Sequence, residues 1–425
     1  MKESIKKRIE AVRRGEVPEG YVSKNHQLRP ADWKYEKIGK YLVPYDEFSN
    51  DTETYPLATS SRQGLMLQSE YYSDQRYEET TGGFHVVPVG YVTYRHMSDD
   101  DIFRFNVNKM GQPVLVSPEY PVFTTTGELD QELLVAYLNG MKEFQAFCSA
   151  QKKGSTRTRM YFHRLCEFTI PIPSITEQQK IAEILKACDR VIELKQQLLE
   201  EKRRQKQWLM QKLLDPNSGV KLPGFGTRAW KEIPLSEVFL YIRNGFVGTA
   251  TPYYVDDGIP YIEGTNIQNG QWDLSEVLHI SEEFHRQHSN SVLQAGDVVV
   301  VQSGHVGDCT VVTEEIAGSN SHAIIIMTPT PRINSHYCAC YINSPMGQGK
   351  LVGCITGNTV KHILASDMKN YLLPCPEKDE QDELATLFCA VEKEITAIEK
   401  EIEAWRQKKK ALMQLLLTGL LRVNA

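Results

Sequence analysis

Two segments of this chain resemble each other closely enough to decide how it folds. Residues 171–214 read PIPSITEQQKIAEILKACDRVIELKQQLLEEKRRQKQWLMQKLL, and residues 374–417 read PCPEKDEQDELATLFCAVEKEITAIEKEIEAWRQKKKALMQLLL. Aligned at an offset of 203 without a gap, they share 15 identical residues in 44 positions. Average residue usage predicts about three. The chain therefore carries an internal duplication, whose period is far longer than the ~20–50 residues of a solenoid repeat.

Each segment predicts a long helix with an apolar seam. Seam positions alternate in spacing between four and three residues, which is typical of a coiled coil. In the first copy they are Ile181, Leu185, Cys188, Ile192, Lys195, Leu199, Lys202, Lys206, Leu209 and Leu213. In the second copy they are Leu384, Phe388, Val391, Ile395, Ile398, Ile402, Trp405, Lys409, Leu412 and Leu416. A helix from Glu177 to Leu214 would be about 57 Å long at ~1.5 Å per residue.

Both seams need a partner surface. Because the two copies lie in one chain, we expect the helices to pair with each other as an antiparallel coiled coil with pseudo-two-fold symmetry. The alternative is two ordinary amphipathic helices, each packed on its own domain. The absence of Gly and Pro over 38 residues favours pairing, since the mean helix of a globular domain has about 11–12 residues.

The regions before each helix, roughly 33–168 and 230–371, are rich in short β-like runs separated by turn signals such as Asn269-Gly270. Each contains one predicted helix, Glu132 to Ala146 and Ser335 to Asn343. The sequence thus predicts an α+β fold, with two mixed α/β globules separated by two long helices. The predicted parts are an N-terminal basic segment (1–32), a first globule (33–173), a first helix (174–216), a linker (217–229), a second globule (230–376), a second helix (377–419) and a C-terminal tail (420–425).

Composition limits the function classes. The net charge of −6 excludes attraction of the whole molecule to nucleic acid, although local basic patches are compatible with it. No stretch approaches ~18 consecutive apolar residues, and no apolar core of a signal peptide follows the basic N-terminus. We therefore expect a cytoplasmic protein without membrane contact.

Catalytic motifs are missing from the sequence. There is no phosphate-binding Gly-x-x-x-x-Gly-Lys-Ser/Thr loop, no dinucleotide-binding Gly-x-Gly-x-x-Gly after a strand and no Gly-x-Ser-x-Gly elbow. The Asn/Asp-Pro-Pro-Tyr/Phe signature of adenine methyltransferases is absent too. His285 and His288 lie three apart beside acidic residues, and Asp99 to Asp101 form an acidic run, but a solvated surface explains both. The sequence therefore predicts no catalytic and no metal site.

Polar and basic loops are the better candidates for a function. Residues 151–168 hold five basic residues against one acid, and residues 357–362 occupy the equivalent place in the second copy. Arg suits bidentate contacts to guanine, Asn and Gln suit adenine, and Lys, Ser and Thr suit phosphate. The predicted DNA-binding residues are Arg62, Gln63, Lys153, Thr156, Arg157, Arg159, Asn266, Gln268, Ser303, His305, Thr359, Lys361 and His362. A generic polar surface explains any single one of these loops equally well.

The chain resembles the specificity subunit of a type I restriction–modification system over nearly its whole length. The resemblance rests on two copies of one pattern, Pro-x-Pro followed by Glu-Gln, and on short stretches after each helix. They are Ile170 to Pro173 with Glu177 to Ala182, Pro374 to Pro376 with Glu380-Gln381, Leu222 to Phe225, and Leu417 to Gly419. The second copy departs mildly, with Asp382 and Glu383 where the first has Gln179 and Lys180.

The resemblance implies a non-catalytic subunit in which each globule is a target-recognition domain for one half of a split double-stranded DNA site. The helices would set the spacing and dock methylation subunits, usually two, through which restriction subunits join. The docking and coiled-coil residues would be Ile181, Leu185, Ile192, Leu199, Leu209, Leu384, Phe388, Ile395, Ile402 and Leu412. S-adenosylmethionine, ATP and Mg would belong to the partners, with no cofactor on this chain. Two alternatives stay open: an enzyme with its own chemistry, and a coiled-coil scaffold that binds only protein.

Overall fold

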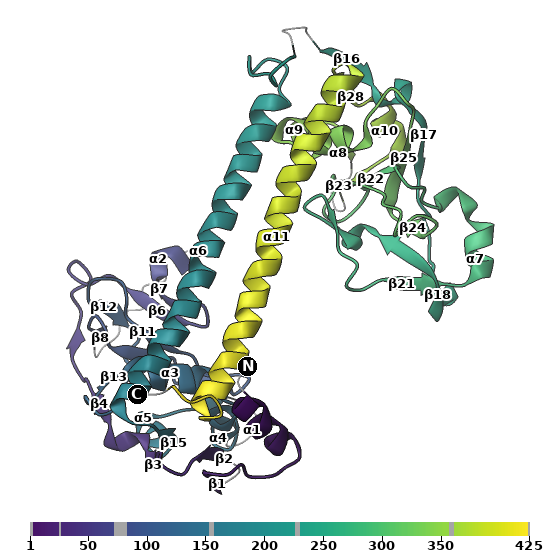
Figure 1. Ribbon diagram of the computed structural model, residues 1–425. Helices are drawn as coiled ribbons and strands as arrows, with labels where there is room; N and C mark the ends of the chain where they lie inside the picture. The colour runs from purple at the N-terminus through teal and green to yellow at the C-terminus, as the bar shows by residue number, and fades with distance from the viewer. Residues whose placement is uncertain are drawn as a thin grey trace. The chain divides into compact units, whose positions relative to one another are not determined.

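The computed structural model describes residues 3–24, 27–71, 83–152, 157–225, 230–356 and 361–423. The chain divides into two compact units, of which unit 1 comprises Met1–Leu194 with Ile402–Ala425 and unit 2 comprises Lys195–Glu401. The division cuts both long helices. Each unit therefore contains one globule and a length of each helix (Figure 1).

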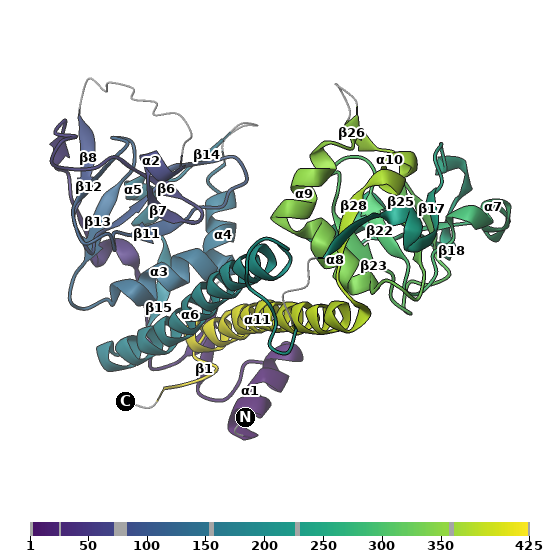
Figure 2. The ribbon, with the colours of Figure 1, turned by 90° about the horizontal axis from the view of Figure 1, so that it is seen from above.

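The two predicted long helices are continuous and run side by side (Figure 2). They are α6 (Ile175–Leu213) and α11 (Lys378–Leu417). In unit 2, Lys202 pairs with Glu394 at 2.6 Å. In unit 1, Asp189 pairs with Lys409 at 2.5 Å. Residue numbers rise along one helix as they fall along the other, so the predicted antiparallel pairing is confirmed.

The charged positions of the first seam have partners on the facing helix. Lys195, Lys202 and Lys206 form ion pairs with Glu401, Glu394 and Glu392. Between a quarter and a third of each lysine side chain stays exposed, 26%, 31% and 25%. The stems thus cover apolar neighbours while the ammonium groups reach glutamates at the rim, which is how lysine is accommodated beside a seam. The buried apolar seam residues are Ile181, Leu185, Cys188, Leu199, Leu213, Leu384, Phe388, Ile395, Ile398, Ile402 and Leu416.

Unit 1 has a four-stranded antiparallel sheet at its centre. In spatial order its strands are β11 (Phe105–Val107), β9 (Val92–Tyr94), β13 (Val122–Thr125) and β4 (Leu42–Pro44). A second sheet has β12 (Val114–Val116), β8 (Phe84–Val87) and β5 (Phe48–Ser49). Two-stranded pairs are β1 (Tyr21–Lys24) with β2 (Gln27–Pro30), β3 (Lys34–Lys37) with β15 (Thr169–Ile172), β6 (Ala58–Ser61) with β7 (Gly64–Leu67), and β10 (Met97–Ser98) with β14 (Thr158–Arg159). The helices are α1 (Glu3–Arg13), α2 (Gln68–Tyr71), α3 (Gln131–Gly140), α4 (Lys142–Ser149) and α5 (Phe162–Leu165).

Unit 2 repeats this plan. Its four-stranded sheet is β23 (Cys309–Val311), β22 (Val298–Val301), β25 (Ile324–Pro329) and β17 (Phe239–Asn244), the same order as β11-β9-β13-β4. The second sheet is β21 (Leu278–Ile280), β18 (Tyr254–Glu263) and β24 (Asn320–His322), with β18 and β24 parallel. Two-stranded pairs are β16 (Lys231–Pro234) with β28 (Leu372–Cys375), β19 (Ile267–Gln268) with β20 (Gln271–Trp272), and β26 (Ile355–Thr356) with β27 (His362–Ile363). The helices are α7 (Glu282–Gln287), α8 (Ser335–Asn343), α9 (Pro345–Val352) and α10 (Ala365–Asn370).

Matching hydrogen bonds show that the duplication extends through the globules, where the sequences barely align. Asn139 at the end of α3 bonds both backbone groups of Phe105, at 2.9 Å each. Asn343 at the end of α8 does the same for Cys309, at 3.0 and 2.6 Å. The predicted pair of α+β globules with one plan is therefore confirmed, and the plan is kept by side-chain-to-backbone bonds that alignment does not reveal.

One predicted helix is wrong in extent. The sequence predicted a single helix from Glu132 to Ala146, but Met141 is extended (φ −96°, ψ 133°) and separates α3 from α4. Asn139 and Gly140 are weak helix formers, and Asn139 is occupied with Phe105. Gly140 also has no room for a side chain, because a Cβ there would lie 2.2 Å from the Met413 methyl group of α11. The break thus lets α3 approach the long helix.

The Glu-Gln motif joins each globule to the start of its long helix. The indole of Trp33 donates to Glu177 at 3.1 Å, and that of Trp230 donates to Glu380 at the same distance. All four polar groups of the neighbouring glutamines are used in parallel ways: Gln178 bonds Asp130 N, Glu128 O and Pro173 O, and Gln381 bonds Asn334 N, Arg332 O and Pro376 O. The motif is therefore a repeated internal fastening, and both acids and both amides are buried.

The terminal segments close unit 1 at the end of α11. Tyr21 donates to the Gly419 carbonyl at 2.6 Å, and Arg8 donates to Leu420 O at 3.1 Å. Arg422 adds bonds to both oxygens of Glu177, at 2.8 and 2.9 Å, and to Asp32. These two carboxylates raise the pKa of Arg422. The N-terminal segment and the C-terminal tail are therefore held together by hydrogen bonds and ion pairs, and these bonds add to those of the Glu-Gln motif in unit 1.

Replacing Glu177 tests this fastening. The Glu177→Ala variant leaves the Trp33 indole N–H without its buried acceptor and leaves Arg422 only its bonds to Asp32, so the free energy of unfolding should fall by about 1–3 kcal/mol. Glu380→Ala is the matched variant, because among the described residues Glu380 accepts from the Trp230 indole but bonds to no arginine. We expect urea-dependent hydrogen exchange to show a clearly larger loss of protection around β3 and β15 in Glu177→Ala than around β16 and β28 in Glu380→Ala. Equal losses would show that Arg422 contributes nothing.

Candidate nucleic-acid interface

In unit 1, the predicted basic segment forms an edge of the globule. Its strand β14 pairs with β10, with Arg159 opposite Met97. Arg95 precedes β10, and both arginines are exposed. Neither forms a hydrogen bond or ion pair with any residue that the structure describes. Two uncompensated guanidinium groups at one edge are available for phosphate or a base edge.

Aromatic rings lie beside these arginines. Tyr161 is 44% exposed and stacks on His96 and His163, with ring centroids 5.8 Å apart in each case. Burial lowers the pKa of His96, opposed by Glu119, and Arg159 and Arg95 add to the lowering. A neutral imidazole behind an exposed tyrosine offers a flat surface on which a base can stack. Tyr161 and Arg95 are not among the residues predicted from the sequence, because no run of basic residues marks Arg95 and the stack of rings around Tyr161 is formed by tertiary packing.

Arg62 and Arg157, both predicted DNA contacts, are held by acids. Arg62 lies in the β6–β7 turn and pairs with Asp100 at 2.5 Å, while Arg157 pairs with Asp99 at 2.7 Å. Gln63 is exposed in the same turn. Lys153 and Thr156 lie outside the described residues. The acidic run from Asp99 to Asp101, which the sequence predicted to be a solvated surface, therefore has basic partners.

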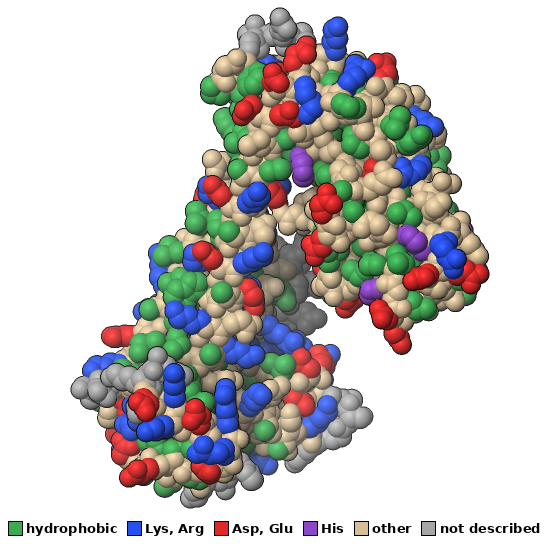
Figure 3. Space-filling model, turned by 45° about the vertical axis from the view of Figure 1, so that its right-hand side comes forward, with side chains coloured by type: hydrophobic (Ala, Val, Ile, Leu, Met, Phe, Trp, Pro, Cys, Tyr) green, Lys and Arg blue, Asp and Glu red, His purple; other side chains and the backbone are tan. Residues whose placement is uncertain are grey.

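A polar cavity of about 560 Å³ opens beside this edge. Its lining includes Arg62, Gln63, Arg95, Arg104 and Ser60. In unit 1, hydrogen-bond donors that the sequence predicted and others that it did not predict thus line the same cavity. In Figure 3 the part of the surface formed by unit 1 carries Lys and Arg side chains interleaved with Asp and Glu.

The corresponding edge of unit 2 has the same backbone and different side chains. Ser303 bridges to His362, as Met97 pairs with Arg159 in unit 1. The next amides match as well, since Ile363 N donates to Gln302 O and Met160 N donates to His96 O. Lys361 is exposed there, and Thr359 lies outside the described residues. His362 therefore occupies the position of Arg159, so the predicted loops at 303 and 362 do meet.

Two further unit 2 candidates have structural bonds, and a third is nearly free. Asn266 is buried, and its amide bonds Glu263 N, Asp273 O and Glu276 O within 3.0 Å. In this structure the Asn266 amide is therefore occupied by the backbone, and these bonds would have to break before it could contact DNA. His305 is exposed but its Nε2 bonds Ile267 O at 2.6 Å. Gln268 is exposed, with only a long 3.4 Å bond to Thr265 O.

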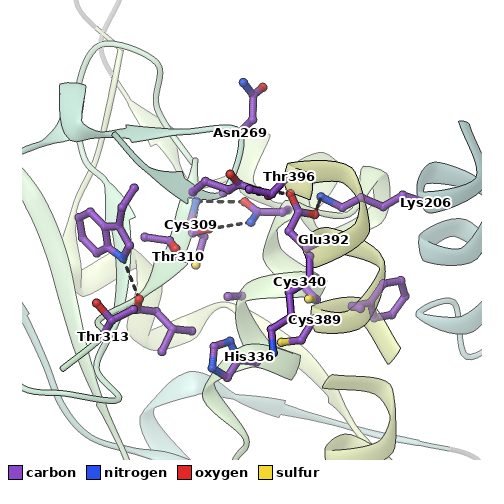
Figure 4. A pocket seen from close by; sticks show the side chains of 18 of the residues that line it. Lys206, Asn269, Cys309, Thr310, Thr313, His336, Cys340, Cys389, Glu392 and Thr396 are labelled. Atoms are coloured by element: carbon purple, nitrogen blue, oxygen red, sulfur yellow. Dashed lines mark hydrogen bonds and ion pairs between the residues drawn. The ribbon is translucent and has the colours of Figure 1, made fainter. Parts of the chain in front are cut away.

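A second cavity lies between the unit 2 globule and the long helices (Figure 4). It measures about 510 Å³, and Met210, Trp272, Val311 and Phe388 give it apolar walls. The Asn269-Gly270 turn forms its rim, and Gln271 reaches Thr396 of α11 at 3.3 Å. The β19–β20 hairpin thus lines the cavity and bonds to α11.

Comparison with known proteins identifies the family. A family model described as the type I restriction modification DNA specificity domain matches residues 104–202 and 227–404. The chain belongs to this family. One matched range falls in each duplicated half, in agreement with the repeated architecture.

Curated specificity subunits and a solved structure resemble the chain, two of them over more than nine-tenths of its length and one over about half. The MjaVIII specificity subunit of Methanocaldococcus jannaschii is 22% identical over 423 residues, covering 94% of this chain and 95% of that protein. The EcoKI specificity subunit of Escherichia coli K12 is 22% identical over 215 residues, covering 48% of this chain and 44% of that protein. The crystal structure of an S subunit from M. genitalium has a TM-score of 0.58 at 15% identity, covering 93% of this chain and 97% of that one. The fold of this chain is therefore that of an S subunit.

Neither a metal centre nor a membrane span stands out in the described part of the chain. No group of three or more His, Cys, Asp or Glu side chains is arranged to hold a metal ion there. Among the same residues, no helix combines the length and apolarity needed to cross a bilayer. The candidate interface consists of surface donors and rings.

Proposed function

We propose that this specificity subunit reads double-stranded DNA through two globules, each of which recognises one half of a split target. One observation carries the proposal: the two units share a backbone plan but present different side chains at the same edge. At equivalent positions, unit 1 has Arg159 opposite Met97 and unit 2 has His362 opposite Ser303. Arg95 and Tyr161 are exposed beside the unit 1 pair. Equivalent frames with unlike donors suit the reading of two unlike half-sites, because base edges are distinguished by donor and acceptor pattern.

The long helices are proposed to set the distance between half-sites and to dock methylation subunits. Their continuity over 39 and 40 residues supports the first role, since a helix resists compression where a loop does not. The surface of α6 supports the second, because it exposes Leu198 (45%) and Trp208 (53%). Large exposed apolar groups on a subunit of a complex mark sites of protein contact. Two methylation subunits, carrying S-adenosylmethionine, and restriction subunits with ATP and Mg joined through them, complete the proposed cytoplasmic assembly.

A map of methylated adenines tests the proposal. The chain is co-expressed with its neighbouring methylation subunit in a host that lacks adenine methylation, and N6-methyladenine is located across the genome. We expect a split motif with a fixed gap, absent when this chain is omitted. A soluble complex that methylates nothing with cognate partners would instead support the alternative, a coiled-coil scaffold that binds only protein.

A further inference from the structure

The acidic run before β11 is a rigid set of carboxylates placed among the basic residues of unit 1. Ser98 Oγ and Ile102 N both donate to Asp100, at 2.9 and 3.3 Å. Thr158 donates to Asp101, whose φ of 63° lies in the left-handed region. These bonds fix the loop and the carboxylates of Asp100 and Asp101 independently of the arginines, and they keep the backbone of Asp99 at the same edge.

The arginine pairs themselves are built for exchange. Arg62 and Asp100 are 63% and 43% exposed, and Arg157 and Asp99 are 54% and 68% exposed. Ion pairs this open have a small net free energy and are screened by salt. The pair of Arg422 with Glu177 is the contrast within the same unit, because Glu177 is 5% exposed. A phosphate that approaches Arg62 or Arg157 therefore competes with a carboxylate on nearly equal terms.

Two kinds of arginine thus share one edge. Arg95 and Arg159 are unpaired among the described residues, whereas Arg62 and Arg157 are bound to acids. Asp99 lines the same cavity as Arg62 and Arg95. We propose that Asp99 and Asp100 are internal competitors for DNA phosphate, which hold Arg157 and Arg62 and lower the affinity of unit 1 for DNA of any sequence. This inference rests on the proposed function of unit 1 as a DNA-reading domain.

The consequence is shorter residence on non-target DNA. Each cation that contacts a phosphate releases counterions, and this term supplies essentially all sequence-independent affinity. Two arginines occupied by carboxylates remove part of that term without removing the arginines. At a target, contacts to bases can draw them away from Asp99 and Asp100, because a bidentate guanine contact is stronger than an exposed ion pair.

Asp99→Asn is the sharpest test, because among the described residues the Asp99 side chain bonds to Arg157 alone. The complex with methylation subunits is titrated with a duplex lacking the target, between 50 and 200 mM salt. We expect about fivefold tighter binding, since an exposed pair is worth up to about 1 kcal/mol. We also expect the slope of log affinity against log salt to steepen by about 0.9, the value of one phosphate contact.

Two controls separate competition from bulk charge. Asp46 is exposed, and its carboxylate forms no bond with the described residues, so Asp46→Asn removes one charge without freeing a cation and should leave the slope unchanged. Arg157→Gln should abolish the effect of Asp99→Asn, whereas Asp100→Asn should act independently through Arg62. Equal effects of Asp99→Asn and Asp46→Asn would overturn the proposal, as would weaker binding in Asp99→Asn. Target-specific methylation by the unchanged complex shows separately whether the proposed function holds.

Discussion

Exchange of residues 38–168 for the matching range of another specificity subunit is expected to change one half of the methylated motif and leave the other half and the gap intact. The structure sets these boundaries. Ile38 N donates to Phe168 O at 2.8 Å, directly inside the β3–β15 pair. The exchange thus keeps β3, β15 and the Trp33–Glu177 bond, so the new globule is joined to the long helices through the contacts of this chain. Maps of N6-methyladenine before and after the exchange give the result.

The reciprocal exchange is the matched control. Leu235 N donates to Tyr371 O at 3.0 Å, inside the β16–β28 pair, and marks the equivalent boundary in unit 2. Exchange of residues 235–371 should therefore change only the other half of the motif. A change of both halves from either exchange would refute the division of labour between the globules. Loss of all methylation with an intact complex would show that recognition needs surfaces outside these ranges.

The helical scaffold could be predicted from sequence because its physics is local and periodic. The seam, with its spacings of four and three, is visible in the sequence. The three lysines of the first seam are explained only by the structure, because their ion-pair partners Glu401, Glu394 and Glu392 lie on the facing helix. The break at Met141 was not predictable in this way. It depends on Asn139 reaching Phe105 and on Met413 filling the space beside Gly140, and neither contact is local in sequence.

The candidate interface was predictable only in outline. Residue type selected Arg159 and Arg157 alike, yet one is unpaired among described residues and the other is bound by Asp99, 58 residues away. The Asn266 side chain could pair with adenine by its chemistry, but its amide is hydrogen-bonded to three backbone groups. A polar side chain serves the fold or a ligand according to what tertiary structure places beside it, and that information is absent from a single loop.

The same contrast explains why the two halves kept their helices and lost resemblance elsewhere. Glu177 with Trp33 and Glu380 with Trp230 perform one structural task twice, because each carboxylate accepts the indole hydrogen and, in unit 1, also pairs with the charge of Arg422. The edge residues Arg159 and His362 share a backbone position but differ in side-chain chemistry. Their backbone is fixed by neighbouring amides, which leaves the side chains free to differ.

Lengthening both helices together is expected to lengthen the gap in the methylated motif. Three heptads inserted after Leu199 in α6 and after Ala397 in α11, which face each other by the numbering of the ion pairs, preserve the seam. Twenty-one residues add about 32 Å at ~1.5 Å per residue, close to nine base pairs at ~3.4 Å each. That is nearly one turn of DNA, so both half-sites would still face the protein.

Two shorter or unbalanced insertions isolate the cause. One heptad in each helix adds a length equal to about three base pairs. A gap longer by about three base pairs turns one half-site by roughly a quarter turn or more around the DNA axis relative to the other. Both half-sites then no longer face the protein, so methylation should fall by at least tenfold. Three heptads in α6 alone separate Lys202 from Glu394 and Lys206 from Glu392, and this variant should not assemble. An unchanged gap with full methylation in the balanced three-heptad variant would contradict the proposal that the helices set the spacing, since the DNA would then be measured by something other than the length of α6 and α11.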